Sequence, residues 1–88
     1  MSIFSNNGGG SGGGGGGAGN PKSEFLTVVP STNRTQWTST QDVIAETDTT
    51  DVNGVLQQLG DAYTISGNIF TFNFSVPNDV SPYSRYWY

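Results

Sequence analysis

Side chains that carry out chemistry are scarce in this chain of 88 residues. It has no histidine and no cysteine, so the usual general base, the commonest metal ligand and any thiolate are missing. Seven carboxylates remain, and glycosidase-like chemistry needs a pair of such groups. Because they lie on threonine-rich or turn-forming stretches of a chain too short for a deep cleft, we expect no enzyme. No catalytic, metal-binding or cofactor-binding residue is predicted.

Charge and hydropathy argue against two kinds of partner, nucleic acids and membranes. Lys22, Arg34 and Arg85 are the basic residues, and the net charge is −4. Nucleic-acid affinity rests on neutralising phosphates, so no nucleic-acid partner is expected. No apolar run approaches the roughly 20 residues that span a bilayer, and "MSIFSNN" lacks the features of a signal peptide. We therefore expect no membrane partner either.

The most distinctive side chains lie at the other end, in "YSRYWY" (83–88). Aromatic residues and arginine are favoured at the centres of protein interfaces, so this stretch is a candidate assembly surface. It is equally typical of a last strand, with either Tyr86 and Tyr88 or Trp87 facing inward. The same rings could also stack on sugars. The candidate interface residues here are Tyr83, Arg85, Tyr86, Trp87 and Tyr88.

A glycine tract precedes the part of the chain that can fold. Ten of the twelve residues 8–19 are glycine. The tract matches the pattern of a phosphate-binding loop, but no strand precedes it and no helix follows. An artificial linker would be more regular, so we interpret residues 1–23 as a native arm that a partner holds. Ile3 and Phe4 at its tip are candidates to enter a pocket on a neighbour.

Residues 24–88 are predicted to form one small β domain. In 62–76, a turn at Gly67-Asn68 of type II′ pairs Ser66 with Ile69 and Tyr63 with Phe72. One face of this hairpin is then apolar and the other is polar. Further strands are expected at 24–29, in "RTQWTST" (34–40), in or along the edge of "DVIAETD" (42–48), and at the end of the chain.

Residues 51–60 allow two interpretations. Val52, Val55, Leu56 and Leu59 have helical spacing, whereas Asn53-Gly54 is a strong hairpin signal. The order "VNGVLQQ", "YTISGN", "FTF", then Pro77, Asp79 and Tyr86 resembles a small β-sandwich module of tailed-bacteriophage fibre and appendage proteins. The resemblance covers about residues 50–88 and favours the hairpin. The chain departs from the pattern of these modules at Leu59 and Ala62.

The resemblance implies an all-β fold, a small antiparallel β-sandwich or a sheet of hairpins, and a place in a phage virion. We expect a non-catalytic fibre-type or adaptor protein that docks on the tail or capsid. A capsid decoration protein or a host-surface glycan-binding module is the alternative. The expected partners are other virion proteins and copies of this chain, with a trimer as one candidate state.

Few large apolar residues are available for an interior, so neighbouring chains are expected to complete the fold. The residues expected inside are Phe25, Leu26, Val28, Trp37, Ile44, Leu56, Tyr63, Ile65, Phe70, Phe72, Phe74 and Val76.

Overall fold

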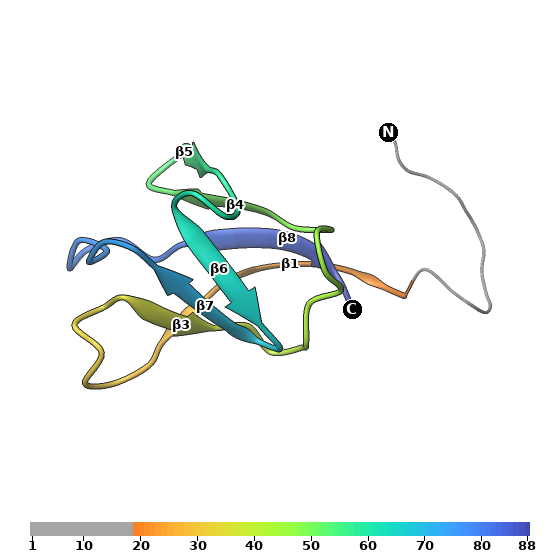
Figure 1. Cartoon of the computed structure of the whole chain (residues 1–88), viewed down its shortest axis with the longest axis horizontal. Coiled ribbons are helices and arrows are strands. Elements are labelled where there is room, and N and C mark those ends of the chain that lie inside the picture. Colours follow the sequence, from red (N-terminus) through yellow and green to blue (C-terminus); the bar gives the residue numbers. More distant parts are fainter. Residues whose placement is uncertain (1–18) are drawn as a thin grey trace.

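Two antiparallel sheets of four strands each form the fold in a computed structural model, which describes residues 19–88 (Figure 1). The strands are β1 (Pro21–Phe25), β2 (Thr27–Val28), β3 (Gln36–Thr38), β4 (Thr49–Val52), β5 (Val55–Gln57), β6 (Tyr63–Ser66), β7 (Ile69–Phe72) and β8 (Tyr83–Trp87). Their order is β1-β8-β4-β5 in one sheet and β2-β3-β7-β6 in the other. The predicted all-β architecture is confirmed, and no helix occurs in the described residues.

The hairpin of β6 and β7 has the predicted register. Ser66 pairs with Ile69 and Tyr63 with Phe72. Gly67 has a φ of 62°, and Asn68 is not in the left-handed region, as a type II′ turn requires. The second strand ends at Phe72, however, and does not continue to Val76.

Residues 51–60 contain a hairpin and not a helix. Asn53 and Gly54 have φ values of 53° and 81°, so both central residues of the turn are left-handed, as in a type I′ turn. Val52 pairs with Val55 and Asp51 pairs with Leu56. The turn chemistry therefore outweighs the helical spacing of the apolar residues.

The predicted strand 24–29 is divided between the two sheets. β1 pairs with β8, β2 pairs with β3, and Leu26 lies between them. Leu26 is buried, and its N–H donates to the carbonyl oxygen of Pro82. The chain thus crosses from one sheet to the other in a single residue, and the strand begins earlier than predicted, at Pro21.

No strand forms at 42–48, contrary to one of the expectations for that segment. A turn occupies Ala45-Glu46, and Glu46 has a left-handed φ of 65°. The segment still ties the sheets together, because the Val43 N–H donates to the Gly67 carbonyl and the Ile44 N–H donates to the Trp87 carbonyl.

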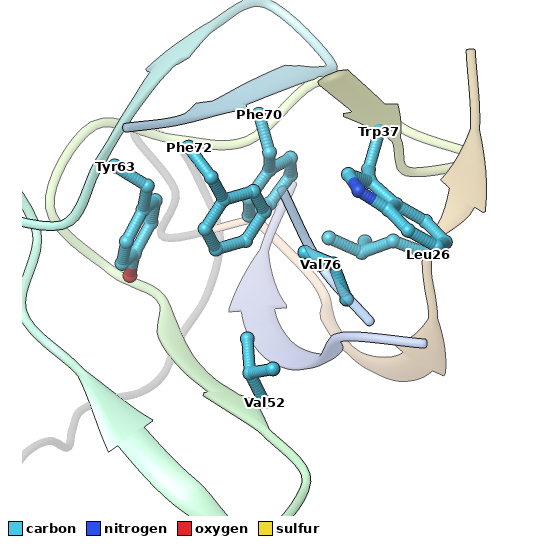
Figure 2. Packing of buried hydrophobic residues seen from close by; sticks show 7 residues of the cluster. All are labelled: Leu26, Trp37, Val52, Tyr63, Phe70, Phe72 and Val76. Atoms are coloured by element: carbon cyan, nitrogen blue, oxygen red, sulfur yellow. The ribbon is translucent and has the colours of Figure 1, made fainter. Parts of the chain in front are cut away.

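The apolar interior lies between the two sheets. Figure 2 shows Tyr63, Phe72 and Phe70 side by side, Trp37 over Leu26, and Val52 approaching from below. The rings of Tyr63 and Phe72 lie 5.3 Å apart between centroids. The buried apolar residues are Leu26, Trp37, Val52, Tyr63, Phe70, Phe72, Val76 and Tyr86.

Three residues expected inside are exposed: Phe25 by 66%, Leu56 by 67% and Ile44 by 40%. Phe25 pairs with Tyr83 and Leu56 pairs with Asp51, and this register turns both apolar side chains to the outer face of their sheet. Ile44 lies next to a turn. The interior is therefore smaller than the count of apolar residues suggests.

An arginine holds the connection between β7 and β8 in place. The Arg34 guanidinium donates to the carbonyl oxygens of Val76, Pro77 and Val80 at 2.7–2.8 Å. Its Cζ lies 4.9 Å from the centroid of the Trp37 ring, and the Trp37 indole N–H donates to the Arg34 carbonyl. Arg34 has a left-handed φ of 57°, a conformation that costs about 1–2 kcal/mol. These contacts offset that cost.

Replacing Arg34 with lysine is expected to lower the free energy of unfolding by about 2–4 kcal/mol, because an ammonium cannot reach three carbonyls and stack on an indole at once. Urea denaturation followed by tryptophan fluorescence measures the change. Arg85→Lys is the matched control, since Arg85 makes a single exposed ion pair and its replacement costs under about 1 kcal/mol. Equal losses in the two variants would contradict the structural role of Arg34.

Phe70→Ala is expected to cost about 3–5 kcal/mol, because Phe70 is completely buried. Phe25→Ala removes the same atoms from an exposed position and is expected to cost about 1 kcal/mol or less. The comparison, made by urea or thermal denaturation, tests the assignment of Phe25 to the surface. A loss at Phe25 as large as that at Phe70 would show that the assignment is wrong.

Candidate functional site

The candidate interface residues of 83–88 are divided by the alternation of β8. Ser84 and Tyr86 face the interior and are almost fully buried, whereas Tyr83, Arg85 and Trp87 face outward. Of the two orientations left open by the sequence, the structure has Tyr86 inside and Trp87 outside, where 38% of its surface is exposed.

The register of the sheet extends this outward face across four strands. Tyr83 pairs with Phe25 of β1 and with Asp51 of β4, and Asp51 pairs with Leu56 of β5. Phe25, Tyr83, Asp51 and Leu56 therefore form one row across the outside of the sheet. Together with Arg85 and Trp87, we call these residues the β8 face.

Aromatic and charged groups contact one another within the β8 face. The rings of Phe25 and Tyr83 meet edge to face, 4.8 Å apart between centroids. The Arg85 Cζ lies 5.2 Å from the centroid of the Tyr83 ring, and one guanidinium nitrogen lies 3.7 Å from an Asp51 carboxylate oxygen. An open depression of about 570 Å³ adjoins these side chains. The face thus combines aromatic and apolar side chains with one pair of opposite charges, and Ser23 and Thr49 flank Arg85 in the next row.

The end of the chain and the end of the arm lie side by side. Asn20 and Tyr88 exchange two backbone hydrogen bonds, which extend the pairing of β1 with β8 (Figure 1). Gly19 has a φ of 78°, and a Cβ at that position would collide with the Tyr88 carbonyl. Tyr88 itself is half-buried. The arm therefore leaves the domain beside β8, while Ile3 and Phe4 lie outside the described residues.

Beneath the β8 face, Tyr86 is fixed by a carboxylate. Its hydroxyl donates to Glu24, which also accepts hydrogen bonds from the Thr40 N–H and hydroxyl. Burial by itself raises the pKa of Glu24, but the hydrogen bonds from Tyr86 and Thr40 outweigh it, so the pKa is lowered. Burial and the hydrogen bond to Glu24 raise the pKa of Tyr86. The arrangement fixes the orientation of the Tyr86 side chain.

A second carboxylate fixes Tyr63. The Tyr63 and Thr50 hydroxyls both donate to Asp48 Oδ2, and the Thr50 and Ser84 hydroxyls are 2.9 Å apart. Burial, followed by the hydrogen bond to Asp48, raises the pKa of Tyr63. This network bridges the two sheets, because Tyr63 belongs to one and Thr50 and Ser84 belong to the other.

The described residues contain neither a cluster of potential metal ligands nor a helix long and apolar enough to span a membrane. The fold defines a small antiparallel β-sandwich protein, and one of its outer faces exposes Phe25, Leu56 and Trp87. Comparisons of the chain with protein-family models, curated proteins and solved structures found no match.

Sequence reasoning missed Phe25, Asp51 and Leu56 as members of the β8 face. Phe25 and Leu56 have the residue type of an interior position, and Asp51 has that of a helix or turn boundary. Only the pairing of β8 with β1 and β4 brings them next to Tyr83. The missing signal was the register between strands that are far apart in the sequence.

The hydrogen bonds to Glu24 predict a dependence of stability on pH. The pKa of Glu24 is lower in the folded protein than its ordinary value of 4.5. The ionised carboxylate therefore adds to the free energy of unfolding above pH 4.5, and this stabilisation is lost as the pH falls through the folded pKa. Glu24→Gln is expected to remove this part of the acid destabilisation, as measured by urea denaturation at a series of pH values. Glu46→Gln, at an exposed carboxylate, is the control and should leave the loss of stability at low pH unchanged. The same loss in Glu24→Gln as in the wild type would contradict the interpretation.

Proposed function

We propose that this protein is a non-catalytic structural component of a tailed-phage virion, a fibre-type or adaptor module that docks on the tail or capsid. The arm that precedes β1 and the β8 face make the contacts. Capsid decoration is the alternative place within the particle. The observation that carries the proposal is the difference between the outer faces of the two sheets.

The outer face of the sheet β2-β3-β7-β6 is polar. The register places Thr27, Thr38 and Ser66 in one row with Ile69, and Gln36, Thr64 and Thr71 in the next. The opposite surface of the molecule, the β8 face, exposes the apolar side chains of Phe25 and Leu56 by about two thirds. The Phe25 ring contacts the Tyr83 ring, and such a contiguous exposed aromatic patch on one face of a small protein is typical of an interaction site.

The phage context rests on the resemblance of residues 50–88 to fibre and appendage modules. It is supported by the positions of the two tight turns, since Asn53-Gly54 and Gly67-Asn68 connect hairpins at the corresponding points of the pattern. The proposed role also fits a chain without histidine or cysteine, in which the half-buried carboxylates of Glu24 and Asp48 accept hydrogen bonds from tyrosines.

A glycan-binding role is the competing function for the same aromatic residues. Sugars stack on open ring faces, but the Tyr83 ring is approached by Arg85 and by the Phe25 ring. Trp87 remains as the exposed indole of the face. These contacts favour a protein partner, which can cover the whole row from Phe25 to Leu56.

The double variant Phe25→Ser/Leu56→Ser is expected to be incorporated into virions at least about 10-fold less well than the wild type, because it removes two exposed apolar anchors. The amount of each tagged chain in purified particles is measured by quantitative mass spectrometry. Ile69→Ser is the matched control, since Ile69 is an exposed apolar residue of the other outer face.

Equal incorporation of the double variant would contradict the role of the β8 face. Absence of the wild-type chain from purified particles would overturn the virion assignment. Saturable binding to a glycan array that requires Trp87 would support the competing function instead.

A further inference from the structure

The edge of the sandwich at β6 contains a gap with unpaired backbone groups. β6 is the edge strand of its sheet, and its two-residue hairpin directs the N–H and C=O of Ser66 and Thr64 toward β7. The backbone groups of Tyr63 and Ile65 therefore point outward. The Gly60 N–H donates to the Tyr63 carbonyl, and the Val43 N–H donates to the Gly67 carbonyl. Between these two hydrogen bonds, the N–H and C=O of Ile65 have no backbone partner within residues 19–88.

An apolar groove of about 380 Å³ opens at this gap. Val43, Ala45, Leu59 and Ile65 are among the residues that line it, with Glu46 the one charged residue of the lining. Val43 and Ile65 also pack against the buried cluster between the sheets, so a side chain in the groove would extend the interior. Outward-facing amide groups beside such a groove are the features that bind an extended peptide as an added strand.

We propose that this groove binds residues 2–5, with Ile3 or Phe4 inserted, from the arm of a second copy of this chain. The inference deepens the assembly role proposed above by naming the partner of the arm. The gap between residues 63 and 67 spans about 13 Å, the length of four extended residues. Residues 2–5, "SIFS", supply two large apolar side chains, whereas glycines 8–10 and 12–17 have none with which to fill a groove.

Charge and reach agree with this occupant. Residues 1–18 contain no charged side chain. Binding in the groove therefore neither places a negative side chain beside Glu46 nor buries a charged side chain without an ion-pair partner. A Cβ on Gly19 would contact the Ile44 side chain, and Ile44 lies between two residues of the groove wall, Val43 and Ala45. A return to the groove of the same chain would need only a few residues. The fourteen residues between Phe4 and Gly19 reach about 45–50 Å when extended, a length suited to a neighbouring molecule.

Paramagnetic relaxation enhancement on the full-length chain tests the proposal. The chain has no cysteine, so Ser2→Cys places one spin label at the tip of the arm. Spin-labelled chains that contain no ¹⁵N are mixed with ¹⁵N-labelled wild-type chains. We expect signal loss at the amides of Val43 and residues 64–67 of the ¹⁵N-labelled copies. A label at exposed Ser75→Cys is the matched control and should leave these amides unchanged.

Two variants locate the contact. Ile3→Ser/Phe4→Ser in the spin-labelled copies is expected to weaken the association about 10-fold or more, since the groove then has no large apolar side chain to bind. Ala45→Asp in the ¹⁵N-labelled copies places a charge in the groove and is expected to have the same effect, with the ¹⁵N spectrum reporting that the fold is intact.

No signal loss in the mixed sample would overturn the proposal, and so would loss confined to samples in which the label and ¹⁵N are on one chain. Either result could accompany normal incorporation into virions through the β8 face, in which case the assembly role stands without this contact.

Discussion

The contact between Arg34 and the 76–80 segment is the constraint on which the arrangement of the sheets depends. That segment belongs to the connection that carries the chain from β7 in one sheet to β8 in the other. Its carbonyl groups would repel one another if they converged without a donor, and the guanidinium provides one for three of them. Trp37 lies beneath the cation and links the connection to the interior. The path of this connection determines where β8 begins.

With β8 in place between β1 and β4, its alternation creates two different surfaces from one strand. The inward residues belong to two tyrosine-and-hydroxyl networks, one with Glu24 and one with Asp48. These networks pair the tyrosine hydroxyls with carboxylates, whereas Asp48 Oδ1 is buried without a hydrogen-bond partner. The outward residues meet Phe25 and Leu56 and form the β8 face. Although the protein is small, several of its large apolar side chains therefore lie on the surface. Their exposure is the physical basis of the assembly role proposed for it.

The candidate site was predicted in part. The sequence identifies β8 as an aromatic strand and leaves open which of its rings face outward, because alternation gives two solutions of equal merit. It places Phe25, Ile44 and Leu56 inside, since residue type is the only guide before pairing is known. Arg34 carried no signal either, because its partners are carbonyl groups that every residue has. The groove at β6 depends on which backbone groups remain unpaired, and single sequences do not show that.

By itself, the sequence determined the features that depend on neighbours along the chain. Asn53-Gly54 and Gly67-Asn68 specify tight turns through their backbone preferences, and the two faces of the β6–β7 hairpin follow from alternation with a period of two. Only the tertiary structure decided how these hairpins pair with the remaining strands, where Leu26 takes the chain between sheets, and which apolar residues stay outside. Those choices minimise the free energy of contacts between residues that are distant in sequence, and no local preference encodes them.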